Sequence, residues 1–192
     1  MALLLRNEAD PSQPNDNGDL ALYIAVRNNY DILSGILLHK SQNSEKDANW
    51  TNQIGDPLIN IAASNSNAQI VRSLLQHGAD PNSMDMMENT PLNIAAEKGD
   101  IMTISVLLEN DADIDHPNIM GTTPVMAAAR NQHTEVANQL AAQGADTEVR
   151  DYSGIAANDF GDFNAQLIRL DEEVDAVFLY DASPANDDKG NQ

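Results

Sequence analysis

The sequence predicts an all-α fold in which helix-turn-helix units, joined by short β-hairpin loops, stack into a solenoid. The first observation is a period, because Ala62, Ala95 and Ala128 are spaced by 33 residues. Two further sets keep this spacing, namely Leu74, Leu107 and Leu140, and Ala79, Ala112 and Ala145. A fixed period of this length indicates that each unit buries its apolar face on its neighbours. The second observation is composition: aromatic residues make up 4% of the chain, which favours helices packed through small and aliphatic side chains.

The first helix of each unit is predicted by its N-terminal residues. Thr90 and Thr123 are placed to cap a helix with their hydroxyl groups, and the proline after each one occupies the first helical position, where no N–H is needed. Pro57 has the same role in its unit, one residue early. Paired alanines such as Ala95 and Ala96 mark the place where two helices approach closely.

The second helix of each unit is predicted by an apolar face and a glycine that ends it. Leu107 and Leu108 belong to such a face. Gly78 and Gly144 come directly after their helices, where a left-handed residue ends a helix at least cost. Asp111 takes that position in the unit between them, so we expect a slightly strained backbone there.

The unit boundaries follow from this register. An earlier unit is marked by Ala25, and the next follows 37 residues later, so the loop KSQNSEKDANWTN carries four extra residues. We expect a repeat domain over residues 1–170, with a partial N-terminal unit, units near 15–47, 52–84, 85–117 and 118–150, and a degenerate cap at 151–170.

Both ends are predicted to be irregular. Leu4 and Leu5 lie 33 residues before Leu37 and Leu38, so the chain begins in mid-repeat. Either a longer protein was cut there or a lone helix caps the stack. At the other end, a helix over 171–180 is expected to close the stack, and a disordered acidic tail is expected over 181–192.

Several phrases of the chain resemble the ankyrin-repeat family, whose pattern combines Thr-Pro-Leu, paired alanines, Leu-Leu and Gly-Ala-Asp. These phrases are TPLNIAA, LLQHGADPN, TPVMAAA and LAAQGAD. The resemblance covers about residues 3–170, and it is specific because several positions recur together in phase. Asn93 and Met126 depart from the pattern, because the family usually has histidine there. The resemblance implies a non-catalytic protein that recognises another protein through its hairpin tips and the first helices on the concave side.

Composition excludes several classes of partner and site. The formal charge of −20 argues against binding to nucleic acid or an anionic membrane, since both need clustered lysine and arginine. The chain has no cysteine, which excludes disulfides and thiolate metal sites. The apolar run Ala2–Leu5 is too short for a signal peptide or a spanning helix. We expect a cytoplasmic protein, with a periplasmic location and secretion into a host cell left open.

The sequence contains no sign of catalysis or of a bound cofactor. Its four histidines are spread over different units, namely His39, His77, His116 and His133. Asp80, Asp113 and Asp146 recur in phase, but they belong to the turn pattern and should stand about 10 Å apart, too far to share one metal ion. We therefore predict no enzyme, no metal and no cofactor.

The same register places apolar residues at successive hairpin tips, with basic residues beside them. The predicted partner-binding residues are Ile54, Met84, Met86, Met87, Lys98, Ile119, Met120, Arg130, Arg150 and Tyr152. Methionine suits such a surface because it is flexible and polarizable. Basic residues of these rows roughly balance the acidic ones, which predicts an apolar, near-neutral recognition surface on a strongly acidic body.

Other interpretations remain open at this point. The tip residues could simply pack on one another. The second candidate function is an acidic inhibitor or immunity-type protein, which covers a basic active site or mimics nucleic acid. An enzyme would need a second domain beyond either end. In the first interpretation the chain is a monomer or a segment of a larger chain.

Overall fold

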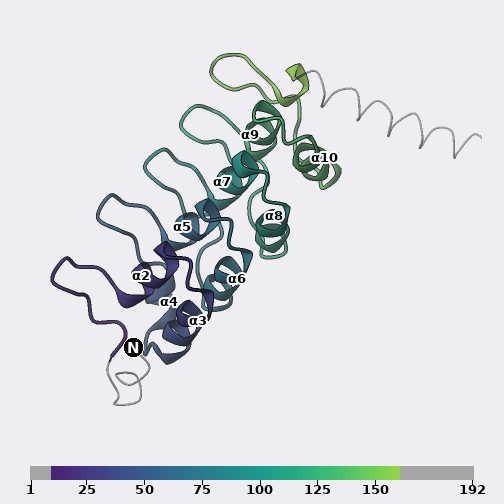
Figure 1. Ribbon diagram of the computed structural model, residues 1–192. Coiled ribbons are helices and arrows are strands. Elements are labelled where there is room, and N and C mark those ends of the chain that lie inside the picture. The colour runs from purple at the N-terminus through teal and green to yellow at the C-terminus, as the bar shows by residue number, and fades with distance from the viewer. Residues whose placement is uncertain (1–9, 161–192) are drawn as a thin grey trace, which may run out of the picture.

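The computed structural model describes residues 10–160, which form two rows of stacked helices (Figure 1). The first helices of the units are α2 (Ala21–Arg27), α5 (Leu58–Ser64), α7 (Pro91–Lys98) and α9 (Pro124–Arg130). The second helices are α3 (Asp31–Lys40), α6 (Ala68–Gln76), α8 (Ile101–Leu108) and α10 (Thr134–Ala142). The long loops that precede the first helices all project to the same side of the stack (Figure 1).

The residues that mark the period form the core between the two rows. Each first helix packs on the first helix of the next unit, as α7 does on α5 and α9, and α6 packs between α3 and α8. The repeated alanines are at most 1% exposed, namely Ala25, Ala62, Ala95 and Ala128. The repeated leucines Leu74, Leu107 and Leu140 are fully buried. The predicted all-α solenoid is therefore confirmed.

The first helices begin in three different ways. Thr90 caps α7 as predicted: its Oγ1 accepts a hydrogen bond from the N–H of Asn93 at 3.3 Å, and the Oδ1 of Asn93 accepts one from the N–H of Thr90 at 3.0 Å. Thr123 does not cap α9, because its hydroxyl is buried and has no hydrogen-bond partner among the described residues. Pro57 stands before the first residue of α5, so the prediction that it occupies the first helical position was wrong by one residue.

The second helices end as the sequence predicts. Gly78 and Gly144 are left-handed, with φ of +86° and +98°. Asp111 has the same conformation, with φ of +61°, although it carries a side chain. The left-handed conformation expected at this position is therefore confirmed, and the strain that it implies stays a prediction.

The loops differ from the prediction in two respects. The expected β-hairpins are almost without strand, since residues 10–160 contain only the isolated bridges between Thr51 and Pro57 and between Arg150 and Ala156. The loop that carries the four extra residues is not simply a longer irregular loop, because it contains the five-residue helix α4 (Ser44–Ala48). Asn49, which follows α4, donates a hydrogen bond from Nδ2 to the carbonyl of Gly78 at 2.7 Å. This loop thus contacts the next unit.

The last described element is the 3-10 helix η1 (Ala157–Asp159). Residues 1–9 of the predicted N-terminal unit lie outside the described residues. The same holds for residues 161–170 of the predicted cap, the predicted helix over 171–180 and the predicted tail over 181–192. These assignments stay predictions.

Candidate functional site

Five loops share one hairpin geometry, and we number their tips 1 to 5 in chain order. Each tip begins with an asparagine or aspartate, namely Asn15, Asn52, Asp85, Asn118 and Asp151. In tip 3, the Oδ1 of Asp85 accepts hydrogen bonds from the N–H groups of Met87 at 2.8 Å and Asn89 at 2.9 Å. The side chain thus satisfies two main-chain donors in a loop that has no strand ladder. The same two bonds recur in all five tips, which gives them one conformation.

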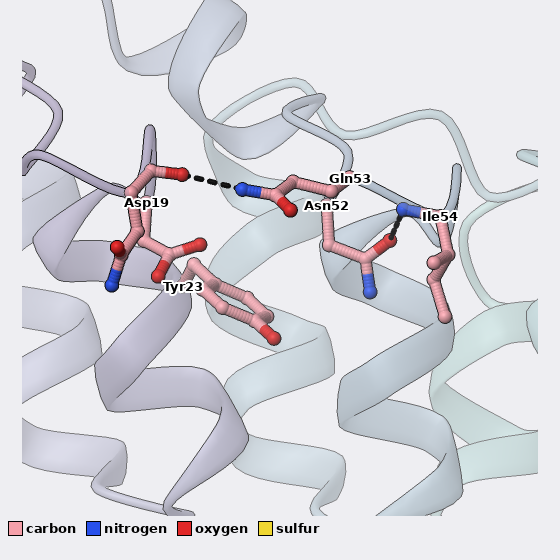
Figure 2. A pocket seen from close by; sticks show the side chains of 6 residues that line it. Asp19, Tyr23, Asn52, Gln53 and Ile54 are labelled. Carbon is pink, nitrogen blue, oxygen red and sulfur yellow. Dashed lines mark hydrogen bonds between the residues drawn. The ribbon is translucent and has the colours of Figure 1, made fainter.

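Neighbouring tips are also bonded to one another. The N–H of Ile119 in tip 4 donates to the carbonyl of Met87 in tip 3 at 3.0 Å, and the N–H of Tyr152 in tip 5 donates to the carbonyl of Met120 at 3.1 Å. Tips 1 and 2 are joined differently, through the Nε2 of Gln53, which donates to the carbonyl of Asn17 at 2.5 Å (Figure 2). Main-chain bonds therefore fix the relative position of tips 3, 4 and 5, whatever side chains they carry.

The predicted apolar residues lie along these tips, and we call them the tip ridge. The tip ridge consists of Ile54, Met84, Met86, Met87, Ile119, Met120 and Tyr152. The exposed fraction of these side chains ranges from 45% for Ile119 to 82% for Tyr152. Large apolar side chains gathered at this exposure on ordered loops are typical of an interaction surface.

The tips contact one another, but this contact does not bury the tip ridge. Met86 lies beside Gly55, where an added methyl group would be 3.5 Å from the Cγ of Met86, and Tyr152 lies close over Gly121. Met86 nevertheless stays 76% exposed. The interpretation that these side chains simply pack on one another therefore leaves most of their surface unexplained.

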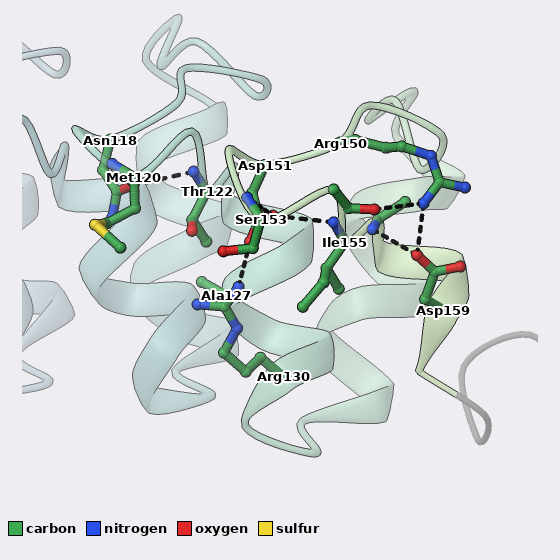
Figure 3. A network of polar contacts seen from close by, with 12 residues as sticks. Asn118, Met120, Thr122, Ala127, Arg130, Arg150, Asp151, Ser153, Ile155 and Asp159 are labelled. Atoms are coloured by element: carbon green, nitrogen blue, oxygen red, sulfur yellow. Dashed lines mark hydrogen bonds and ion pairs between the residues drawn. The ribbon is translucent and has the colours of Figure 1, made fainter.

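The predicted basic residues have different positions. Arg130, at the end of α9, forms an ion pair from Nη2 to the Oδ2 of Asp151 at 2.6 Å, and the side chain of Asp151 is buried (Figure 3). Arg150 pairs through Nη1 with the Oδ2 of Asp159 at 2.9 Å. Lys98 is exposed at the end of α7. Two of the three predicted cations thus hold the last described loop in place.

Both of these carboxylates are stabilised in the charged form. The N–H of Ile155 contributes most to lowering the pKa of Asp151 below its usual value, with further contributions from the N–H of Ser153 and from Arg130. For Asp159, the N–H of Ala156 contributes most, followed by Arg150, and its pKa is also lowered. Hydrogen bonds to a carboxylate favour ionisation, so each ion pair is intact at neutral pH.

These ion pairs change the charge expected for the recognition surface. Because Arg130 and Arg150 are neutralised within the molecule, they do not offset the acidic residues of the N-terminal tips. None of Asp19, Asp56 and Asp85 forms an ion pair within residues 10–160. Beside the apolar tip ridge, tips 1 to 3 therefore carry carboxylates that no cation of residues 10–160 neutralises, whereas the sequence predicted a near-neutral surface.

Comparison with known proteins agrees with this architecture. A family model described as ankyrin repeats in three copies matches residues 1–85 and 59–151. The chain belongs to the ankyrin-repeat family. Ankyrin repeats are in general non-catalytic modules that bind other proteins. A comparison with curated proteins gives no significant match.

Two cavities of this ankyrin stack were not predicted from the sequence. One has a volume of about 370 Å³ and lies between tips 1 and 2, where Asp19 and Tyr23 face Asn52 and Ile54 (Figure 2). The other, of about 150 Å³, lies between α5 and α7 below tips 2 and 3. The sequence feature that bears on the second cavity is Pro57, because it precedes by three residues Asn60, which lines this cavity.

Three of the groups considered for chemistry make structural contacts in the described ankyrin units, namely His133, His77 and Asp80. The Nε2 of His133 contacts the carbonyl oxygen of Glu97 at 3.0 Å, and the Nδ1 of His77 contacts that of Ser73 at 2.7 Å. The Oδ1 of Asp80 accepts from the N–H of Asn82 at 2.9 Å, which is a turn contact. Residues 10–160 contain no cluster of three or more histidine or acidic side chains that could hold a metal.

No helix of the described region has the length and apolar character needed to cross a membrane.

Proposed function

We propose that this ankyrin-repeat protein is a non-catalytic interaction module that binds a protein partner through its concave face and the tip ridge. The observation that carries the proposal is the combination of exposed apolar side chains with rigid, mutually bonded tips. A surface that is already ordered loses little conformational entropy on binding. The partner-binding role of Lys98, Arg130 and Arg150 is part of the proposal, and the ion pairs of the two arginines make their contribution secondary.

Burial of the tip ridge alone supports modest affinity. If six of its side chains each gained roughly 1–2 kcal/mol on partial burial, the gross gain would be about 10 kcal/mol. Association costs about 4–15 kcal/mol before any net binding appears. Polar contacts around the ridge must therefore add to the affinity, and the acidic residues of the N-terminal tips can make them.

The test replaces Met86, Met87, Ile119 and Met120 with serine. Because the bonds between tips 3, 4 and 5 are main-chain bonds, we expect unchanged circular dichroism and thermal unfolding. Affinity capture from an extract of the source organism, quantified by mass spectrometry, should lose the partners that the wild-type protein retains. Unchanged capture would place the interface elsewhere on the molecule.

A matched control removes apolar surface from the opposite side of the stack. Ile36 on α3 is 44% exposed and Met102 on α8 is 66% exposed, and neither belongs to the tip ridge. The variant with serine at both positions should retain the partners. Loss of capture in this control as well would show that the general polarity of the surface, and not the ridge, determines binding.

The second candidate function is the acidic inhibitor, and the net charge of −20 with unpaired carboxylates on tips 1 to 3 favours it. Salt separates the two candidates. A nucleic-acid mimic should lose roughly 10³-fold in affinity between about 50 and 200 mM salt, because many ion pairs are screened together. Binding through the tip ridge should change only a few-fold over the same range.

The remaining parts of the proposal concern the kind of partner, the oligomeric state and the location in the cell. The partner is another protein, and the chain acts as a monomer or as a segment of a larger chain, in the cytoplasm. Sedimentation of the purified chain, with and without a captured partner, measures its oligomeric state.

A further inference from the structure

The cavity between α5 and α7 combines carboxylates, an amide and aliphatic walls. Its volume is about 150 Å³, a size that holds a benzene molecule in other proteins. The residues that line it are Asp56, Asn60, Ile61, Ser64, Asp85 and Ile94. The two aspartates come from tips 2 and 3, and the other residues come from the two helices.

The amide of Asn60 is buried but incompletely bonded. Asn60 is 2% exposed, and its Nδ2 donates to the carbonyl of Asn89 at 2.8 Å. Its Oδ1 is buried without a hydrogen-bond donor among the described residues. A buried acceptor without a donor is unfavourable, so this oxygen would gain from a donor outside the chain, which reaches it when the side chains around the cavity shift.

The missing donors are explained by Pro57. One unit later, the Oδ1 of Asn93 accepts from both the N–H of Thr90 at 3.0 Å and its hydroxyl at 2.8 Å. Pro57 occupies the position that Thr90 has in that unit, and proline has neither an N–H nor a hydroxyl. The sequence change from threonine to proline thus leaves the Oδ1 of Asn60 without either donor.

Within the part of the chain that the structure describes, both carboxylates at the cavity lack a cation. The Oδ2 of Asp56 accepts from the Nδ2 of Asn52 at 3.0 Å, and the Oδ2 of Asp85 accepts from the Nδ2 of Asn89 at 3.0 Å. These amide contacts orient the carboxylates without neutralising them. No lysine, arginine or histidine of residues 10–160 forms an ion pair with either aspartate.

The neighbouring grooves of the stack lack this combination. In the next groove, Asn89 and Asn118 take the positions of the two aspartates, and the equivalent amide of Asn93 is fully bonded. In the preceding groove, Arg27 takes the position of Ser64 and brings a positive charge. The cavity between α5 and α7 is therefore the most suitable of the three for a cation.

We propose that this cavity binds a lysine or arginine side chain of the protein partner. The inference rests on the proposed function and adds the chemistry of one contact. The aliphatic stem of the basic residue lies between Ile61 and Ile94, its charged end pairs with the carboxylates of Asp56 and Asp85, and one of its N–H groups supplies the donor that Asn60 lacks.

The test uses nuclear magnetic resonance of the full chain labelled with ¹⁵N, and its probe is Nα-acetyl-arginine amide. The side-chain amide signal of Asn60 should shift in a saturable way, with a dissociation constant in the millimolar range. The corresponding lysine amide should also bind. The citrulline amide, which has the shape of arginine without its charge, should bind at least about tenfold more weakly. Equal shifts with arginine and citrulline, or no shift of Asn60 with arginine, would overturn the proposal.

A double variant keeps the fold and removes the charge. Asp85→Asn preserves the tip, since Asn15, Asn52 and Asn118 begin tips of the same geometry, and Asp56→Asn introduces the residue that the next unit has as Asn89. Combined, the two changes should weaken binding of the arginine probe at least about tenfold. The matched control, Glu135→Gln with Glu148→Gln, removes two exposed charges elsewhere and should leave binding of the probe unchanged.

A third variant isolates the role of Asn60. Pro57→Thr restores the missing donors while both carboxylates stay, so it should weaken probe binding several-fold and raise thermal stability. Unchanged probe binding would remove Asn60 from the proposal.

The outcomes separate this inference from the proposed function. If the tip-ridge serine variant loses its partners but the arginine probe does not bind, the interaction module stands and the cation cavity fails. If the probe binds but the double variant Asp56→Asn with Asp85→Asn captures partners as the wild type does, the partner does not use the cavity. The inference then fails, and the interaction module again stands.

Discussion

At the scale of single residues, three positions of the repeat need a left-handed backbone. At the tips this position holds glycine in every unit but one, where Glu88 has φ of +58°. After α6, α8 and α10 it holds Gly78, Asp111 with φ of +61° and Gly144, whereas Ser41 after α3 is extended. After the first helices it is variable: Asn29, Ser66, Gly99 and Gln132. The chain thus carries side chains at several positions where glycine is the least strained residue.

Replacing Asp111 with glycine should stabilise the protein by about 0.5–1 kcal/mol. The left-handed conformation costs a side-chain-bearing residue some strain, and Asp111 is exposed, with no side-chain hydrogen bond to lose among the described residues. Glu88→Gly should have an effect of similar size at its tip for the same reason. Thermal and urea unfolding measure both effects, and a less stable Asp111→Gly protein would contradict the strain argument.

Two left-handed glycines, Gly99 with φ of +72° and Gly144 with φ of +98°, should respond differently to alanine. At Gly99 a methyl group would lie 2.6 Å from the Nδ1 of His133, whereas at Gly144 nothing lies within 4 Å. Gly144→Ala should therefore cost only the backbone strain of about 1 kcal/mol. Gly99→Ala should cost about 1–3 kcal/mol more, because the His133 ring must move away from its contact with Glu97. Urea unfolding of both variants gives the comparison, and equal losses would show that the ring moves freely.

At the scale of helices, equivalent positions of the repeat have different roles. Thr90 and Asn93 form a capping box at the start of α7, and Asn93 also donates from Nδ2 to the carbonyl of Thr122 in the next unit at 3.2 Å. This asparagine replaces the histidine of the family pattern and still links two units. Met126 holds the same position in α9 and is buried, so the link is absent there and Thr123 has no partner for its cap among the described residues.

Changing these two threonines to valine should therefore give opposite results. Thr90→Val removes the cap and leaves the Oδ1 of Asn93 with one donor fewer, so we expect a loss of about 1–2 kcal/mol. Thr123→Val replaces a buried hydroxyl that has no partner within residues 10–160, so its effect should be near zero or stabilising. Parallel thermal unfolding of both variants tests the difference. A loss of similar size at both positions would show that the hydroxyl of Thr123 is also bonded in solution.

At the scale of the whole molecule, the sequence predicts the parts of the fold that repeat. The period, the pairing of helices and the glycines that end the second helices follow from local rules, which act in the same way in each repeat unit. The ion pair of Arg130 with Asp151 was not predictable, because its partners are 21 residues apart and meet only when two units stack. The lengthened loop is another case, because Asn43 caps the five-residue helix α4 by accepting a hydrogen bond from the N–H of Lys46, and the sequence predicted only extra loop residues.

The candidate site also has features that the sequence predicts and features that appear only in the folded structure. Exposure of the apolar tip residues could be predicted, since they follow from the register alone. The charge of the recognition surface could not, because a count of basic and acidic residues does not show which ones neutralise each other. The unbonded oxygen of Asn60 depends on the absence of two donors from Pro57, and a pattern that scores each position separately does not detect this.

The response of the whole molecule to acid should depend on the last described loop. Asp151 and Asp159 have lowered pKa values in the folded protein, so their charged forms stabilise the fold at every pH above the ordinary aspartate value of about 4. This contribution is lost as the pH falls through the folded pKa values, below about 4. Protonation of other carboxylates relieves the repulsion that comes with a net charge of −20, and it acts in the opposite direction. The difference in unfolding free energy between the wild type and a variant at Asp151 is therefore more informative than the unfolding free energy of the wild type alone.

The comparison is between the wild type and Asp151→Asn, which keeps the tip geometry because asparagine begins tip 4 in the same way. The variant should be less stable than the wild type at pH 7, and the two stabilities should converge as the pH falls below about 4, where Asp151 becomes protonated. Urea unfolding at a series of pH values measures the convergence. Arg130→Gln serves as the partner variant: its effect and that of Asp151→Asn should not add in the double variant, because both remove one ion pair. Additive losses at pH 7 would show that Arg130 does not stabilise the charged form of Asp151, whose lowered pKa would then come from the hydrogen bonds of the loop alone.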